Sequence, residues 1–301
     1  MTELNAISSM ENAELAEFIA GISQHIGMPV RLTRCSTSEL IERLHGGSAG
    51  AWDLLLGTAA TALLDPALAW QLMPLTDIEF SGLPDAAVAT DRRWFAASGF
   101  VPAFCYDPKV LAREGLAAPT RWQDLTGREW AGRIALPDPA RSGAGYLHLG
   151  ALLEHYGEPA WALLAQVAGH GPAISGSSTA PIEAVVQGQA WLGVTVSTAA
   201  TRAAEQHPQL RWCVPEDARC YEDEVFACRA GSPNAAYAQQ ALQWMLTPAA
   251  AQISQRYGKV VPGQAHPVGA LQPLPALQAS RDKAARCRQW QALFSRETVH
   301  G

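Results

Sequence analysis

The stretch Ile134-Ala-Leu-Pro-Asp-Pro-Ala-Arg-Ser-Gly-Ala-Gly-Tyr146 predicts a short strand, a turn and an abrupt helix start. Its first three residues are apolar, and the two prolines that follow end a sheet ladder because proline has no N–H to donate. A serine and small residues then lead into an apolar run from Tyr146 to Leu153. A strand that passes into a helix in this way indicates an α/β fold.

The beginning of that helix is a candidate anion site. A helix N-terminus has about four unpaired N–H groups and a partial positive charge, so a phosphate, phosphonate or carboxylate can bind there without a lysine. Taken alone, Ser142 is more simply a helix cap. The surrounding sequence decides between the two interpretations.

The first part of the chain alternates short strand-like runs with amphipathic ones. This alternation predicts a parallel sheet with helices on both faces, which binds ligands at the carboxyl ends of its strands. The expected strands are residues 4–7, 29–33 and 53–56, and the expected helices are residues 13–26 and 37–44. Polar turns after these strands bring Ser9, Thr37 and Thr58 to one edge, although each turn alone is compatible with a plain cap.

Later segments repeat the pattern. Ser177 lies in a polar entrance to a helix expected over residues 181–187, and a strand over residues 191–196 ends at Ser197. The acids Glu222-Asp223-Glu224 form an expected turn before another strand. Such a cluster can transfer protons or bind a cation, but a solvated turn is the simpler interpretation.

Composition limits the possible functions. The chain has 301 residues, of which 48% are hydrophobic and 17% charged, enough for two compact lobes. A net charge of −6 argues against nucleic-acid binding. No apolar run is long enough to span a membrane, and strand-like residues begin at Leu4, as they would if a signal peptide had been removed. We expect the six cysteines to be buried free thiols, although Cys213 and Cys228 could pair across a sheet.

Catalytic motifs are missing from the sequence. It contains no nucleophile elbow, no phosphate-binding P-loop, no H-E-x-x-H and no dinucleotide fingerprint. The eight histidines are scattered, and the cysteines lack the spacing of zinc ligands. We therefore expect a binding protein, not an enzyme, with no cofactor and no metal.

The order of segments resembles the type II periplasmic solute-binding proteins of bacterial ABC transporters, in the branch for iron, phosphonates, sugar phosphates and polyamines. The specific part is the pair Trp122-Gln-Asp-Leu125 and Ser142-Gly-Ala-Gly-Tyr146 at this spacing. Other matching pieces are residues 4–9, 27–30, 130–135, 188–193, 231–234 and 244–249.

The resemblance implies an α/β, two-lobed type II periplasmic binding protein fold. Each lobe would be a mixed sheet flanked by helices, with the ligand in the inter-lobe cleft. Lobe one is expected from residues 1–101 and 230–301, and lobe two from residues 102–229. The resemblance also implies a periplasmic monomer whose partners are a small anionic ligand and an ABC permease, not nucleic acid. A ligand-sensing domain for a signalling partner is the alternative.

The resemblance also suggests the ligand. Iron binders of this family have adjacent tyrosines after the strand that here ends at Thr198, and this chain lacks them, so ferric iron is a second candidate. Hydroxyls and amides suit a phosphonate such as 2-aminoethylphosphonate, or a sugar phosphate. The family's usual threonine in the glycine motif is Ala144 here. Glu222 or Tyr106 would take the other end of the ligand. The candidate ligand-binding residues are Ser9, Thr37, Thr58, Tyr106, Ser142, Gly143, Ala144, Gly145, Tyr146, Ser177, Ser197 and Glu222.

Overall fold

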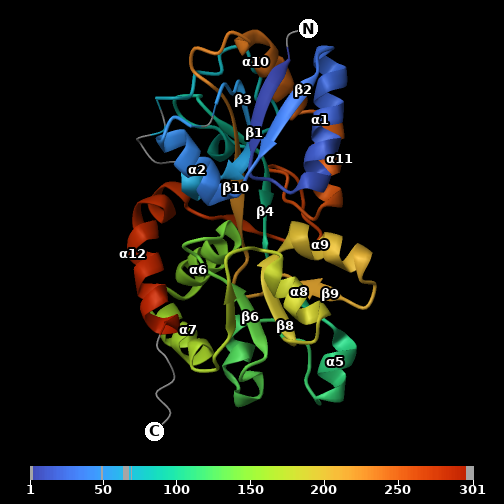
Figure 1. Cartoon of the computed structure of the whole chain (residues 1–301), viewed down its shortest axis with the longest axis vertical. Helices are drawn as coiled ribbons and strands as arrows, with labels where there is room; N and C mark the ends of the chain where they lie inside the picture. The colour runs from blue at the N-terminus through green and yellow to red at the C-terminus, as the bar shows by residue number, and fades with distance from the viewer. Residues whose placement is uncertain (1–2, 49, 64–67, 69, 296–301) are drawn as a thin grey trace. The chain divides into compact units, whose positions relative to one another are not determined.

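The chain forms two compact units. The computed structural model describes residues 3–48, 50–63, 68 and 70–295 (Figure 1). Unit 1 comprises Met1–Phe100 and Glu222–Gly269, and unit 2 comprises Val101–Tyr221 and Ala270–Gly301. The chain therefore passes from one unit to the other after Phe100, Tyr221 and Gly269.

This division differs from the expected lobes at Val101, which falls in unit 2, and at two longer segments. Residues 222–229 belong to unit 1 because residues 222–228 lie in a strand that pairs with two strands of that unit. Residues 270–295 belong to unit 2 because the last helix packs against two helices there. A helical pattern shows that an apolar face exists, but not which sheet it covers, so the sequence could not place the last helix.

Unit 1 is built on a mixed sheet with the strand order β10-β3-β1-β2, and β4 also pairs with β10. The short strand β11 extends this sheet by pairing with Cys220 and Tyr221 of β10, which, like β11, belong to unit 2. The strands β1, β2 and β3 run parallel, whereas β10 is antiparallel to β3 and β4. The carboxyl ends of β1 to β3 therefore lie at the same edge as the beginning of β10. The strand bounds are β1 Leu4–Ser8, β2 Val30–Arg34, β3 Leu54–Ala59, β4 Phe95–Phe100, β10 Cys220–Cys228 and β11 Gln272–Pro273.

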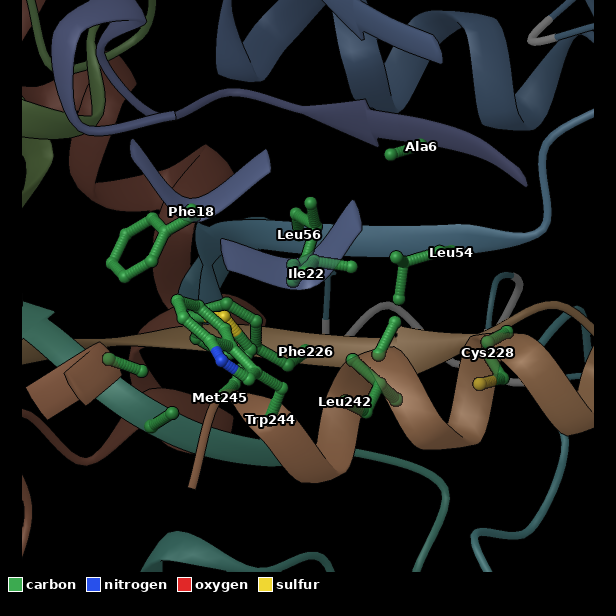
Figure 2. Close-up of a cluster of buried hydrophobic side chains, with 14 of the residues drawn as sticks. Ala6, Phe18, Ile22, Leu54, Leu56, Phe226, Cys228, Leu242, Trp244 and Met245 are labelled. Carbon is green, nitrogen blue, oxygen red and sulfur yellow. The ribbon is translucent and has the colours of Figure 1, made fainter. Parts of the chain in front are cut away.

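Helices cover both faces of the parallel strands of unit 1. Figure 1 shows α1 and α11 on one side of these strands and α2 on the other. The core beneath α1 joins apolar side chains of α1, β3, β10 and α10, and Figure 2 shows Phe18, Ile22, Leu54, Leu56, Phe226, Leu242 and Trp244 there. The helices are α1 Asn12–Ile26, α2 Thr37–His45, α3 Ala60–Leu63, α10 Ala235–Trp244 and α11 Pro248–Arg256, with the 3-10 helix η1 Asp85–Ala87.

The packing of α1 follows from its sequence. Its apolar residues recur at helical spacing and are buried, and Gly27 ends the helix with a left-handed φ of 65°. Gly21 is required by a close approach, because a Cβ there would lie 2.1 Å from the Trp244 ring. The helix is thereby fixed over the sheet, with its beginning at the carboxyl edge of β1.

Unit 2 has a second mixed sheet, with the strand order β7-β6-β8-β5-β9. The strands β6, β7 and β8 run parallel, and β5 is antiparallel to both β8 and β9. The bounds are β5 Pro102–Tyr106, β6 Ile134–Pro137, β7 Ala173–Ser175, β8 Leu192–Val196 and β9 Arg211–Cys213. The turns after β6, β7 and β8 therefore share one edge, where the sequence places its later polar segments.

Eight helical segments accompany this sheet within the described residues. They are α5 Pro108–Arg113, η2 Trp122–Thr126, η3 Arg128–Trp130, α6 Gly143–Tyr156, α7 Ala160–Ala168, α8 Ala180–Val186, α9 Ser197–Gln206 and α12 Ala276–Phe294. The buried His148 of α6 connects η2 with β8. Trp122 Nε1 of η2 donates to His148 Nδ1 over 3.2 Å, and His148 Nε2 lies 2.7 Å from the Thr195 carbonyl oxygen of β8. Burial lowers the pKa of His148 to about 4, so this histidine is a neutral core residue.

The predicted strands and helices are confirmed in type and order, whereas the turn expected at residues 222–224 is part of β10. The α/β fold with two mixed sheets is confirmed. The elements that the sequence did not predict are α5, α9, η1, η3 and the short strands β7 and β11. All six cysteines are free thiols. Among the described helices, none is long and apolar enough to cross a membrane.

Candidate functional site

The helix start after β6 has backbone donors that the fold does not use. Ser142 is the N-cap of α6, yet its side chain makes no cap hydrogen bond. The amides of Gly143, Ala144 and Gly145 lie in the first turn, where a helix supplies no backbone acceptor, and no other described residue accepts from them. The first turn contains no acidic residue. The interpretation of Ser142 as a plain cap is therefore wrong, and the free amides remain available to an anion.

The turn before α6 is held in place by backbone contacts. Asp138 donates its N–H to the Ser175 carbonyl over 2.7 Å, and its own carbonyl accepts from Ser142 N over 2.8 Å. A Cβ on Gly145 would lie 2.5 Å from the Pro137 carbonyl oxygen. Glycine at this position lets α6 begin directly against the end of β6.

Arg141 is a functional candidate that the sequence reasoning missed. Its side chain is exposed and directly precedes the helix start. A Cβ on Gly176 would lie 2.7 Å from the Arg141 Cζ, so the guanidinium covers the backbone of the loop after β7. Its position next to Ser142 in the predicted anion motif was the available signal. The guanidinium charge of Arg141 therefore adds to the partial positive charge that the helix dipole places at the start of α6.

Two other predicted hydroxyls of unit 2 already have hydrogen bonds. Ser177 is exposed, and its Oγ accepts from Ala180 N over 3.1 Å at the beginning of α8. Ser197 is fully buried: its N–H donates to the Val101 carbonyl over 2.9 Å, and its Oγ accepts from Val101 N over 3.4 Å. Both residues follow parallel strands as expected, but their hydroxyl oxygens accept hydrogen bonds from backbone N–H groups of this unit.

The two predicted tyrosines of unit 2 lie elsewhere. The Tyr146 side chain is fully buried, and its hydroxyl donates to the Ala279 carbonyl of α12. Tyr106 pairs with Leu192, the first residue of β8, because β5 is antiparallel to β8. Tyr106 therefore lies at the opposite edge of the sheet from the turn after β8, and its expected ligand role does not fit this unit.

In unit 1 the three predicted hydroxyls come together. Thr37 Oγ1 donates to Ser9 Oγ over 3.3 Å, and Ser9 Oγ donates to Thr58 Oγ1 over 2.9 Å. The chain of hydroxyls joins the ends of β1, β2 and β3, as the parallel register requires. Sequence reasoning thus correctly predicted that these side chains meet at one edge.

The starts of α1 and α2 in unit 1 are occupied, unlike that of α6. Glu14 lies in the first turn of α1 and accepts from Glu11 N over 3.3 Å. In α2, Ser36 accepts from Glu39 N over 3.2 Å, and Glu39 adds an acid to the first turn. A carboxylate at a helix N-terminus repels a second anion, so these two helix starts are poor oxyanion sites.

The acids at residues 222–224 lie within β10 and are buried, so the expectation of a solvated turn is wrong. Glu222 Oε1 accepts from the Thr61 N–H over 3.0 Å and from the Thr61 hydroxyl. The expected contact of Glu222 with one end of the ligand would compete with its hydrogen bonds from Thr61 of α3. Residues this polar in a buried strand escaped prediction because their partners are remote in the sequence.

A buried ion triad surrounds Lys259. Its Nζ lies 2.7 Å from Glu14 Oε2 and 2.6 Å from Glu224 Oε2, and Ser98 Oγ also donates to Glu224 over 2.6 Å. Burial raises the pKa of Glu14 to about 7, Lys259 opposes this rise, and Glu224 adds to it. Burial lowers the pKa of Lys259, but the two carboxylates outweigh it and raise the pKa above its usual value. The triad joins α1 to β10 at the carboxyl edge.

The family follows from sequence comparison. A model for bacterial extracellular solute-binding proteins matches residues 74–291, more than two thirds of the chain. The chain belongs to this family of bacterial extracellular solute-binding proteins. Its members bind solutes for transport, so the expectation of a binding protein rather than an enzyme is confirmed.

Solved structures share the fold over nearly the whole chain. The periplasmic binding protein AfuA from Actinobacillus pleuropneumoniae, with exogenous fructose-6-phosphate bound, matches with a TM-score of 0.82 and 16% identity over 99% of this chain and 100% of that one. A substrate-binding protein of an ABC transporter from Agrobacterium tumefaciens matches with a TM-score of 0.82 and 18% identity, over 97% of this chain and 94% of that one. Iron-bound HitA from Pseudomonas aeruginosa matches with a TM-score of 0.77 and 16% identity, over 97% of this chain and 99% of that one.

These identities show the fold alone, and they confirm the type II periplasmic binding protein fold. No curated protein sequence matches the chain.

Proposed function

We propose that this protein captures a small phosphorus oxyanion at the beginning of α6 and delivers it to an ABC permease. The observation that carries the proposal is the uncapped start of α6: the Ser142 side chain makes no cap hydrogen bond, and the amides of Gly143 to Gly145 have no acceptor among the described residues. A phosphonate or phosphate group offers three oxygens to such donors.

Electrostatics support the choice of an anion. The first turn of α6 lacks an acid, and Arg141 precedes it, so the helix dipole and one guanidinium act together. Ala144 contributes its amide but no hydroxyl. The proposed solutes are 2-aminoethylphosphonate, a related phosphonate or a sugar phosphate.

The family supports a permease partner and a location outside the cytoplasm. We infer a monomeric periplasmic protein that exchanges its solute with a permease and binds no nucleic acid. The expectation that both units contact one solute stays a prediction. The neighbouring genes would distinguish this function from that of a sensing domain. A transporter operon encodes a permease and an ATPase beside the binding protein.

A thermal-shift screen followed by calorimetry tests the proposal. The panel is 2-aminoethylphosphonate, a sugar phosphate and ferric citrate, with the wild-type protein. A bound solute at a hundredfold excess over its Kd stabilises the folded form by about 2.7 kcal/mol, so a phosphorus ligand should raise the melting temperature by several degrees. No shift and no heat with either phosphorus ligand would refute the proposal.

Ferric iron is the second candidate function. Carboxylate oxygens are hard ligands suited to it, but the described residues include no group of three or more His, Cys, Asp or Glu side chains that could hold a metal ion. Serine and threonine hydroxyls at residues 197 and 198 are weak substitutes for phenolates. A visible charge-transfer band on addition of ferric citrate would favour the iron carrier.

A further inference from the structure

The Arg141 side chain lies against a glycine of a different loop. A Cβ on Gly176 would lie 2.7 Å from both the Cζ and the Nη2 of Arg141. Gly176 is not among the glycines with a positive φ, so its backbone conformation does not itself require glycine. What the missing side chain provides is space for the guanidinium. Any larger residue at position 176 would displace it.

This contact lies at the edge of the unit 2 sheet where α6 begins. Arg141 follows β6 and Gly176 follows β7, and these two strands pair in parallel. The Asp138 N–H donates to the Ser175 carbonyl over 2.7 Å, which joins the two turns directly. Ser142 is only 9% exposed, and its side chain makes no hydrogen bond with another described residue. A buried hydroxyl without a partner therefore accompanies the free amides at the same helix start.

The charges at this edge favour a doubly charged anion. The guanidinium is always protonated and can bind two oxygens at once, and the helix dipole adds a partial positive charge. Of the acids in the flanking segments, Asp138 accepts the Ala140 N–H over 2.8 Å, and Glu183 is exposed on α8. A phosphate monoester carries about −1.5 to −2 at pH 7, whereas a sulfonate or a carboxylate carries a single charge.

We propose that Arg141 is a specificity-determining residue that selects a doubly ionised phosphorus group, and that Gly176 is the positioning residue for its guanidinium. The inference rests on the proposed function and narrows it. The solute has a terminal phosphonate or phosphate group, and it is not a phosphodiester, a sulfonate or a carboxylate. Both residues belong to unit 2, so the selection is made within that unit.

Calorimetry with matched ligand pairs tests the inference. The probes are 2-aminoethylphosphonate with taurine, and glucose 6-phosphate with glucose 6-sulfate. Each pair has the same tetrahedral group with three terminal oxygens, and at pH 8 the phosphorus member carries two charges and the sulfur member one. The wild-type protein should bind at least one phosphorus ligand, and should bind it at least tenfold more tightly than its sulfur counterpart.

Variants at the two positions assign this preference. Arg141→Gln should weaken binding of the phosphorus ligand about tenfold, because it removes a charge-assisted hydrogen bond. Arg141→Lys, which retains the charge, should recover part of the loss. Gly176→Ala should weaken the same ligand and should have no effect in the Arg141→Gln background. Arg113→Gln is the control, because it removes an exposed arginine of α5, at the opposite edge of this sheet.

The outcomes separate the proposals. Equal binding of the phosphorus and sulfur ligands by the wild type, or unchanged phosphorus binding in a folded Arg141→Gln variant, overturns the role of Arg141 alone. A loss in Gly176→Ala that persists without Arg141 overturns the positioning role of Gly176. An unchanged melting temperature shows that each variant is folded. No heat with either phosphorus ligand on the wild type overturns the proposed function, and the selection with it.

Discussion

The two units present the same edge of the same kind of sheet with opposite electrostatics. In unit 2 the helix after β6 begins with free amides, no acid in its first turn and Arg141 beside it. In unit 1 the helices after β1 and β2 have Glu14 and Glu39 in their first turns, and β10 adds further buried acids. Topology therefore fixes where a ligand can bind, whereas the residues in the first helical turn decide its charge.

The largest expected effect tests the acidic edge of unit 1. Lys259→Met removes the buried cation between Glu14 and Glu224 and leaves two carboxylates together, so the free energy of unfolding should fall by about 3–5 kcal/mol. Urea denaturation measures this loss. Glu14→Gln is the control and should cost less, because Lys259 keeps its ion pair with Glu224 and burial already raises the pKa of Glu14. Equal losses would contradict this account of the triad.

The contribution of Asp223 to the free energy of unfolding should depend on pH. Its pKa is about 7 in the folded protein against 3.8 for a free aspartate, mainly through burial. Its favourable contribution to stability is therefore complete below about pH 4 and is lost as the pH rises through 7. In the absence of ligand, Asp223→Asn should be more stable than the wild type by about 2–4 kcal/mol at pH 8, with little difference near pH 4. Urea unfolding at the two pH values tests this, and a pH-independent difference would contradict it.

A third prediction concerns the close start of α6 in unit 2. Gly145→Ala places a Cβ 2.5 Å from the Pro137 carbonyl oxygen, and overpacking of this kind costs about 1–3 kcal/mol of stability. Gly169→Ala is the matched control: its φ is −61°, and its Cβ would lie 3.3 Å from the nearest atom. Thermal unfolding of both variants measures the difference. A similar melting temperature for the two would show that α6 does not need its glycine.

The smallest expected effect distinguishes structure from binding within the predicted motif. Tyr146→Phe removes the hydroxyl that donates to the Ala279 carbonyl, and should lower the free energy of unfolding by about 1–2 kcal/mol. Calorimetry with a phosphorus ligand should show less than a twofold change in Kd. A large loss of affinity with unchanged stability would return Tyr146 to the binding site.

Much of the fold follows from local sequence pattern. Alternating apolar runs predicted the strands and helices, and the parallel register then brought Ser9, Thr37 and Thr58 together. The roles of Tyr106 and Tyr146 could not be predicted, because they depend on the direction of β5 and on the docking of α12. Both are contacts between segments remote in the sequence.

The charge of the candidate site was harder to predict than its position. The acids of β10 look like a solvated turn in sequence because Thr61, Ser98 and Lys259, which bond Glu222 and Glu224, lie far along the chain. Arg141 was visible in the decisive stretch, but its importance depends on the missing cap at Ser142, which only the structure reveals.

Calorimetric titration of the phosphorus ligand into Ser142→Asp tests the central claim most directly. Aspartate is a favoured N-cap and complements the helix dipole, so the variant should fold with an unchanged or higher melting temperature. Its charge at the start of α6 should weaken oxyanion binding at least a hundredfold, because juxtaposed like charges cost several kcal/mol. Ser142→Asn, of the same size but neutral, should stay within tenfold of the wild-type Kd. Wild-type affinity in Ser142→Asp would contradict the assignment of the oxyanion to this helix start.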